Sequence, residues 1–243
     1  MKYFIPTVCF ILFSTFSSNA QVDIGIEGGA SYNTMLQKIN GSNRSTQGQV
    51  GYNAGFSLNV PFNYGSRFHI KTGIIFDANT GSESTFKNQS ATGSGVPIFA
   101  DDFRKYRINS LVLPAYVVFK SGDPIFDHQH FFVGLGLSLA YTVGGKFHQI
   151  YTNSLNGNPR TTDNNGEPLR IGTGHYSDYT AFNMGGGATI GYEFSNGMYA
   201  KAHYTQYFLN TNPLQNSNNI FYSAQAGLSL GYYFHTFKSY KQR

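Results

Sequence analysis

The sequence predicts an all-β fold: an eight-stranded antiparallel, up-and-down transmembrane β-barrel with short periplasmic turns and longer external loops. Three observations lead to this prediction. The chain begins with a segment typical of export signals, apolar residues alternate with small or polar ones in eight later segments, and the connections between those segments alternate in length. The composition, with 16% aromatic and only 12% charged residues among 243, excludes an intrinsically disordered chain.

Residues 1–20 have the three parts of a signal peptide. Lys2 provides the basic start, residues 4–16 form an apolar stretch, and small residues ending at Ala20 form the cleavage site. The apolar stretch is shorter than the roughly 20 residues that a transmembrane helix needs. Cys9, the single cysteine, lies within this segment, so the expected mature protein has neither disulfides nor a reactive thiol.

The chain from residue 21 to residue 234 is dominated by an alternation with a period of two residues. At its start, Ile24 and Ile26 alternate with Gly25 and Glu27, as expected for a strand with one apolar face. Each repeat is long enough for a tilted strand to cross a membrane, which takes about 9 to 11 residues. The eight predicted strands cover about residues 22–33, 50–60, 68–77, 106–119, 131–142, 182–194, 198–209 and 222–234. We therefore expect one barrel domain, residues 21–234, and a short basic periplasmic tail, residues 235–243.

A soluble β-sandwich also has alternating strands, so the composition of the two faces decides between the two folds. One face of the predicted strands carries Leu, Ile, Phe and Tyr, and the other carries Gly, Ser, Asn and Thr with few charges. The outer face of a sandwich would carry many more charged residues. Small residues instead suit the crowded interior of a narrow barrel, with the apolar face in contact with lipid.

The connections between the predicted strands support the same topology. The short ones are residues 63–67, 120–129 and 195–197, and the long polar ones are residues 35–49, 80–104, 144–177 and 210–218. Short and long connections alternate along the chain, as in outer-membrane barrels. At the last short connection, a three-residue loop pairs Phe194 with Met198 and keeps both faces consistent. It directs Lys201 inward, within reach of Glu193 on the neighbouring strand.

Two adjacent segments carry a resemblance to a known family. Residues 110–120, SLVLPAYVVFK, are followed after a short turn by residues 131–141, FFVGLGLSLAY. This pattern resembles the outer-membrane β-barrel family common in Bacteroidetes, sometimes called PorT-like, and residues 25–33, 53–56 and 227–234 resemble it as well. The resemblance implies a location in the outer membrane and, for one branch of the family, assistance to protein secretion. It implies no reaction.

Six ionisable side chains are expected to project into the lumen. They are Glu27, Lys71, Asp77, Glu193, Lys201 and His203. Because the interior of an eight-stranded barrel is just wide enough for side chains to fill it, we expect these residues to form a mutually neutralising plug that holds the barrel shape. The alternative is a path for protons or ions.

The long connection over residues 144–177 is the expected site of partner binding. Its aromatic residues Phe147, Tyr151 and Tyr176 are candidate anchors for another protein. The alternative is that they mark strands continuing beyond the membrane. The sequence predicts a non-enzymatic structural or binding component, such as an accessory of a protein secretion or envelope complex. We expect it to contact outer-membrane lipid and lipopolysaccharide and not nucleic acid.

Two other functions remain open from the sequence. One is a porin-like channel for small solutes, because the loops decide whether the mouth is closed. The other is a lipid-modifying enzyme using Ser and His, for which His148, His175 and His203 are candidates without a recognisable local signature.

No cofactor or metal site is predicted. His128 and His130 are spaced as a strand metal site requires, but they lie in an expected turn without a third ligand. Asp101 and Asp102 give weak evidence for calcium. The triple glycine at residues 185–187 lies inside a predicted strand with no following helix, so it indicates a bend or a tight lumen contact rather than a phosphate loop.

Overall fold

The structure, a computed structural model, describes residues 22–39, 41–63, 65–91, 97–122, 129–155, 158–164, 166–173, 176–213 and 220–234. Within these residues the chain forms twelve β-strands. No helix in this part of the chain is long and apolar enough to span a membrane. The expected signal peptide, residues 1–20, and the expected basic tail, residues 235–243, lie outside the described residues.

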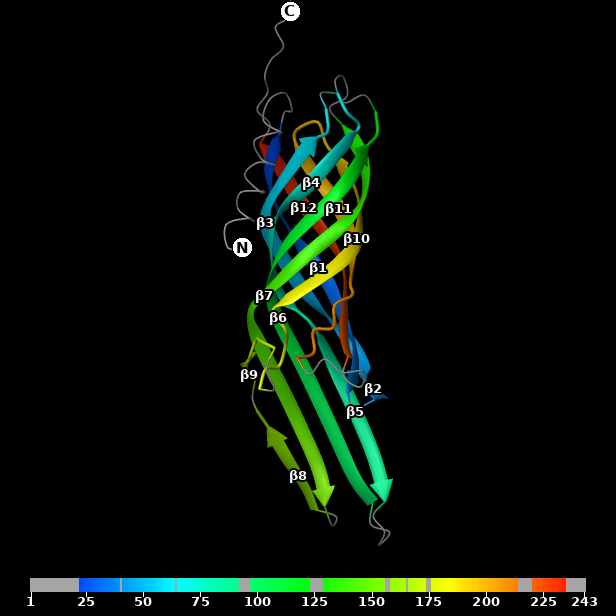
Figure 1. The fold of residues 1–243 in the computed structure, drawn as a ribbon, viewed down its shortest axis with the longest axis vertical. Helices are drawn as coiled ribbons and strands as arrows, with labels where there is room; N and C mark the ends of the chain where they lie inside the picture. The colour runs from blue at the N-terminus through cyan, green and yellow to red at the C-terminus, as the bar shows by residue number, and fades with distance from the viewer. Residues whose placement is uncertain are drawn as a thin grey trace, which may run out of the picture.

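Eight of the described strands form a closed antiparallel barrel (Figure 1). They are β1 (Asp23–Ile39), β3 (Ser45–Pro61), β4 (Phe68–Thr80), β6 (Pro97–Lys120), β7 (His130–Leu155), β10 (Phe182–Glu193), β11 (Met198–Tyr207) and β12 (Ile220–Phe234). Each strand pairs with the next one along the chain, and β1 pairs with both β3 and β12, which closes the sheet. The predicted all-β, eight-stranded fold is confirmed.

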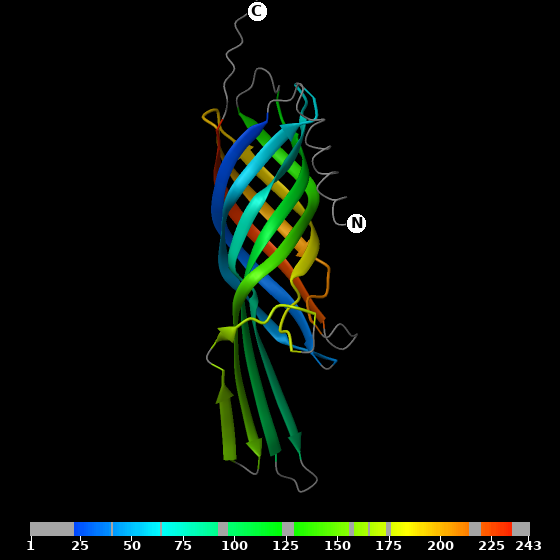
Figure 2. The same ribbon diagram turned by 60° about the vertical axis from the view of Figure 1, so that its left-hand side comes forward.

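The remaining strands are β2 (Ser42–Asn43), β5 (Ser82–Ala91), β8 (Asn158–Asp163) and β9 (Glu167–Pro168). Residues 80–104 and 144–177 were expected to be long loops, and this expectation is wrong for much of their length. Pairing between β6 and β7 continues from Phe119↔Val133 out to Phe99↔Ser154, with one register shift between Asn109 and Ser110. Strands β5 and β8 add to either side, so a sheet projects from one end of the barrel (Figure 2). We call β5, β8, residues 97–105 of β6 and residues 146–155 of β7 the external sheet.

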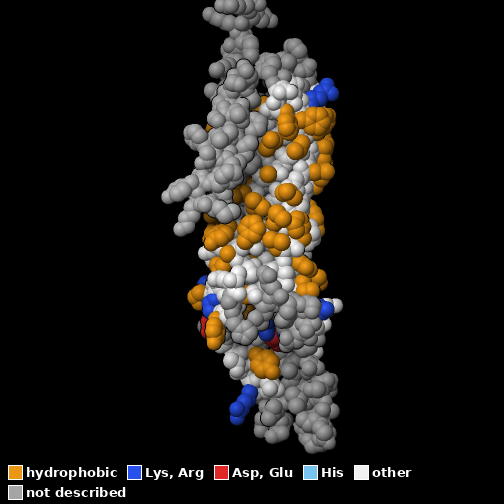
Figure 3. All heavy atoms as spheres, viewed as in Figure 1, with side chains coloured by type: hydrophobic (Ala, Val, Ile, Leu, Met, Phe, Trp, Pro, Cys, Tyr) orange, Lys and Arg blue, Asp and Glu red, His pale blue; other side chains and the backbone are white. Residues whose placement is uncertain are grey.

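The distribution of apolar residues is inverted relative to a soluble protein. Val50, Leu135 and Leu228 are 72%, 69% and 69% exposed on the outer wall, whereas many Ser, Asn and charged side chains are buried inside. Figure 3 shows many hydrophobic side chains spread over the part of the barrel wall that is visible in this view. A contiguous apolar surface of this extent is typical of a wall in contact with lipid and not of a soluble sandwich.

Exposed aromatic rings mark both borders of this apolar wall. At the end with the short connections they are Phe62, Phe68, Phe119, Phe131, Tyr192, Phe194, Tyr232 and Phe234. Toward the external sheet they are Tyr32, Tyr52, Phe76, Tyr141, Phe182 and Tyr204. Paired aromatic girdles are a feature of outer-membrane barrels, whose short turns face the periplasm. The external sheet therefore lies on the outer side of the membrane.

The hairpin between β10 and β11 has the predicted register. The backbone N–H of Phe194 donates to the carbonyl of Met198 at 2.8 Å, and that of Gly197 donates to the carbonyl of Phe194 at 3.0 Å. Gly197 has φ of 84°, the left-handed conformation that a three-residue loop requires. This register confirms that Lys201 faces the lumen.

Candidate functional site

Large side chains fill the lumen because glycine lies opposite them on neighbouring strands. Tyr199 on β11 pairs with Gly231 on β12, and a Cβ at Gly231 would overlap the tyrosine ring. Gly187, within the triple glycine of β10, leaves space for Tyr116, whose hydroxyl would lie 2.8 Å from a Cβ there. The triple glycine is thus a tight lumen contact, as one of the two sequence interpretations expected.

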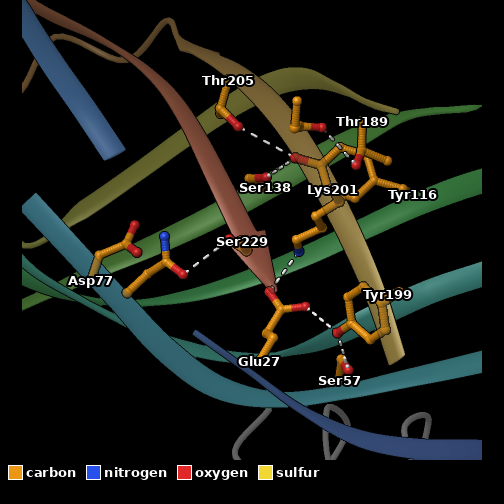
Figure 4. Close-up of polar contacts among 12 residues, drawn as sticks. Glu27, Ser57, Asp77, Tyr116, Ser138, Thr189, Tyr199, Lys201, Thr205 and Ser229 are labelled. Atoms are coloured by element: carbon orange, nitrogen blue, oxygen red, sulfur yellow. Dashed lines mark hydrogen bonds and ion pairs between the residues drawn. The ribbon is translucent and has the colours of Figure 1, made fainter. Parts of the chain in front are cut away.

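Glu27 is the centre of the strongest polar cluster in the lumen (Figure 4). Its Oε1 accepts a hydrogen bond from Lys201 Nζ at 2.6 Å, and its Oε2 accepts one from the Tyr199 hydroxyl at 2.6 Å. The Tyr199 hydroxyl also lies 2.9 Å from Ser57 Oγ. Gly231 pairs with Glu27 on one side and with Tyr199 on the other. The missing side chain at Gly231 is what allows the two residues to meet across β12.

The expected ion pair between Lys201 and Glu193 is wrong. Glu193 Oε2 instead accepts a hydrogen bond from Lys120 Nζ at 2.7 Å, and both side chains are buried. Lys120 was assigned to a turn, but it is the last residue of β6 and points into the lumen at the periplasmic end. Strand pairing shows which residues are neighbours on adjacent strands. Long side chains can also reach partners on strands across the lumen, which strand pairing does not predict.

Lys71 is held by aromatic rings and not by a carboxylate. Its Nζ lies 3.8 Å from the centroid of the Tyr199 ring, 4.8 Å from that of Phe132 and 5.3 Å from that of Tyr233. Among the described residues it has no hydrogen-bond partner. Cation–π contacts of this kind gain strength when water is excluded, so the rings compensate part of the cost of burying the ammonium group.

The two remaining lumen candidates lie apart from these ion pairs. Asp77 accepts a hydrogen bond from Gln225 Nε2 at 3.0 Å. His203 lies over Gly227, where a Cβ would come within 2.6 Å of its Cε1, and its Nδ1 has no partner among the described residues. The six predicted lumen residues therefore face the interior but form several separate groups. Only Glu27 and Lys201 bond directly to each other.

An apolar cluster lies at the external mouth of the barrel. Its buried residues are Met35, Tyr106, Ile108, Leu169, Tyr179 and Phe221, which we call the lid. The segment that supplies Leu169 and Tyr179 is fastened by an ion pair of 2.9 Å between Arg170 and Asp178 and by a backbone hydrogen bond from Thr180 to Thr211 at 3.0 Å. Beneath the lid, Asp77 and Gln225 line a cavity of about 40 Å³.

The candidate anchors of the predicted partner-binding loop have different environments. Phe147 is partly buried and packs against the lid, with its ring centroid 4.9 Å from that of Tyr106, so it is not available as an anchor. Tyr151 is 38% exposed on β7, and Tyr176 is 84% exposed. Phe147 and Tyr151 thus belong to a strand that continues beyond the membrane, which was the alternative interpretation.

The remaining sequence candidates form no metal or catalytic cluster in the described part of the chain. No group of three potential metal ligands is found there. His130 Nδ1 lies 2.8 Å from the backbone carbonyl of Ser121, and His148 Nε2 lies 2.8 Å from Asp163 Oδ1. His128 and His175 lie outside the described residues.

The weak calcium hypothesis for Asp101 and Asp102 is wrong. Successive residues of a strand point to opposite faces, so the two carboxylates diverge. Asp102 is instead held between two cations, Arg44 at 2.7 Å and Arg104 at 3.0 Å, and accepts a further hydrogen bond from Gln149 at 2.9 Å. This cluster ties β6 and β7 to the segment before β3.

The Asp102 cluster makes the external sheet sensitive to acid. Burial alone would raise the pKa of Asp102, but the hydrogen bond and charge of Arg104, with the contributions of Gln149 and Arg44, lower it below the ordinary value of 3.8. A lowered pKa means that the ionised carboxylate stabilises the folded form above pH 3.8, and that this stabilisation is lost as the pH falls through the folded-state pKa. We expect the protection factors of amides in β6 beyond the membrane, which compare exchange with the intrinsic rate at the same pH, to fall steeply below pH 4. Asp102→Asn should show raised exchange already at pH 7 and a flatter pH dependence, and identical profiles would contradict the assignment.

The fold agrees with a comparison to known families. A family model described as "Outer membrane protein beta-barrel domain" matches residues 16–212. The chain belongs to this family. Among solved structures, Neisserial surface protein A is 11% identical, covering 87% of this chain and 97% of that chain, with a TM-score of 0.38. OprG from Pseudomonas aeruginosa is 12% identical, covering 90% and 98%, with a TM-score of 0.40.

A third similar structure is Ail, the attachment invasion locus protein of Yersinia pestis. It is 14% identical, covering 89% of this chain and 100% of that chain, with a TM-score of 0.34. No curated protein matches the sequence. The family places the chain in the outer membrane, and the likenesses are too distant to carry an argument about its specific role.

Proposed function

We propose that this protein is a closed, non-conducting and non-catalytic barrel that binds another envelope or secreted protein through its external sheet. The observation that carries the proposal is the external sheet itself. Strands β6 and β7 extend far beyond the apolar wall, and β5 and β8 pair with them along this extension. An anchoring role alone needs no such projection, whereas ordered external segments of barrels commonly carry recognition.

The edge of the external sheet supplies a means of recognition. Within the described residues β8 pairs only with β7, so its other edge presents backbone groups to an incoming strand. Extended segments of partner proteins add to such edges by backbone hydrogen bonds, and neighbouring side chains give specificity. The exposed rings of Tyr151 and Tyr176 are positioned to contribute apolar contacts.

Conduction is the competing function that the lumen disfavours. The lid, the cluster around Glu27 and the pair formed by Lys120 and Glu193 occupy successive levels of the barrel. The 40 Å³ cavity beneath the lid is far smaller than the roughly 300 to 1,000 Å³ of typical small-molecule sites. A continuous aqueous path would require these levels to rearrange.

Catalysis finds little support in the histidine positions. A serine nucleophile needs a base within hydrogen-bond reach. In the described part of the chain no histidine is hydrogen-bonded to a serine hydroxyl: His203 is packed in the lumen, and His148 contacts Asp163. The class of partner that we propose, a component of a secretion or envelope complex, rests on the resemblance of residues 110–120 and 131–141 to the PorT-like group.

The proposal is tested by shortening the external sheet without touching the lid. Residues 151–162 can be replaced by Asn-Gly so that Ile150 and Asp163, which already pair, flank a two-residue turn. We expect the shortened protein to insert and show normal heat-modifiable mobility, because the barrel strands, Leu169 and Tyr179 remain. We also expect it to lose its partner.

Partner binding is measured by photocrosslinking in intact cells. A photoreactive residue at Thr161 of β8 should give a discrete adduct that is absent when the probe replaces Asn196 in the periplasmic turn. Excess wild-type protein without the probe should compete for the partner and so reduce this adduct. Excess shortened protein should leave the adduct unchanged. Equal competition by the shortened protein, or an adduct only at Asn196, would refute binding through the external sheet.

A further inference from the structure

Two cations face each other on the outer surface just above the membrane wall. Arg107 on β6 pairs directly with Lys146 on β7, and both side chains are exposed. Their neighbours Tyr106 and Ile108 are buried in the lid, so the strand alternation directs Arg107 and Lys146 away from the barrel axis. Like charges directly opposite each other destabilise a sheet. An anion bound between the two cations would offset this repulsion.

The described residues supply no such anion, although they supply carboxylates to the two side chains at the next cross-strand position. One step further from the membrane, Lys105 is ion-paired with Glu83, and His148 contacts Asp163 at 2.8 Å. Neither Arg107 nor Lys146 forms an ion pair with any described residue. Glu167 lies on β9 next to Pro168, which pairs with Lys146, yet it does not come within ion-pair distance of the lysine.

The height of this pair relative to the membrane identifies the anion. The last apolar pair of the outer wall on these strands is Leu111 with Tyr141, and Arg107 lies four residues further along β6. Four strand residues span about 13 Å, or about 10 Å along the membrane normal at the usual barrel tilt. The polar headgroup layer begins at the border of the hydrocarbon core and is several ångströms thick. Long Arg and Lys side chains at this height reach headgroup phosphates.

We propose that Arg107 and Lys146 form a binding site for a phosphate group of a phosphorylated glycolipid in the external leaflet. The planar guanidinium of Arg107 suits two parallel hydrogen bonds to phosphate oxygens, and the Lys146 ammonium adds a second charge. The shared phosphate turns a repulsive cross-strand pair into an attractive one. This site is independent of the protein partner proposed above, because it faces lipid and lies below β8.

The test uses the purified full chain in detergent and lipid A carrying its phosphates as the probe, with retained lipid counted by native mass spectrometry. Arg107→Gln combined with Lys146→Gln removes the site. Lys87→Gln combined with Arg160→Gln is the matched control, because it removes the same charge from exposed cations on the distal part of the external sheet. Both double variants leave the barrel strands below the lid unchanged.

We expect the first double variant to bind lipid A about 30-fold more weakly, which corresponds to about 2 kcal/mol for two surface cations. The control should bind as the wild type does. Dephosphorylated lipid A should be retained poorly by every variant. Millimolar inorganic phosphate should displace lipid A only weakly if the ligand is the lipid headgroup rather than free phosphate. Equal lipid A retention by the two double variants, or equal retention of dephosphorylated lipid A by the wild type, would overturn the proposal.

Discussion

Replacing Lys201 with Met is expected to lower the free energy of unfolding by about 3 to 5 kcal/mol, the usual cost of leaving one partner of a buried ion pair alone. The partner left behind is Glu27, whose Oε1 lies 2.6 Å from Lys201 Nζ. Glu27 would keep only the hydrogen bond from Tyr199. Methionine preserves most of the volume of the lysine stem, so the loss reports the charge and not a cavity.

A second substitution separates this explanation from general damage to the lumen. In the double variant Glu27→Gln with Lys201→Met, no unpaired charge remains, and we expect most of the lost stability to return. The chain has no Trp, so unfolding in urea is best followed by circular dichroism and by heat-modifiable electrophoretic mobility. An unfolding midpoint of Lys201→Met equal to that of the wild type would show that Glu27 does not depend on this lysine.

Gly231→Val is expected to damage the packing of the lumen severely. The added side chain would enter the space of Tyr199, which stacks on Tyr233 at 4.6 Å between centroids and is also bonded to Glu27 and Ser57. Overpacking costs about 1 to 3 kcal/mol and the loss of buried hydrogen bonds a similar amount, so we expect a loss of about 3 kcal/mol or more.

Gly144→Val provides the matched control for this prediction. Gly144 also lies in a barrel strand, but nothing lies within 4 Å of a Cβ built there. It should therefore change the urea midpoint by much less than Gly231→Val. Equal midpoints for the two variants would mean that the lumen is loose enough to accommodate the extra methyl groups, and that the Tyr199 contacts contribute little.

The barrel itself was predictable because its strands carry two independent signals. The alternation of residues shows which face of each strand points inward and which points outward. The length of each connection shows on which side of the membrane it lies. The hairpin at Gly197 added the register, because only one loop length keeps Phe194 and Met198 on the same face.

The external sheet and the lumen partners were not predictable in the same way. Residues 97–105 and 146–155 mix apolar and polar residues at odd and even positions alike, so they lack the alternation that marks the wall. The partners of Glu27 and Glu193 depend on which long side chains meet across a closed lumen. That geometry depends on the positions of glycines such as Gly231, which strand periodicity does not reveal.

The central claim is that the barrel is closed and acts as an anchor for its external sheet, and steady conductance of the purified full chain in planar lipid bilayers tests it most directly. The lid and the filled lumen predict no steady ohmic current at moderate voltage in molar salt. Large, steady currents that scale with salt concentration would contradict this account and would favour a porin-like channel.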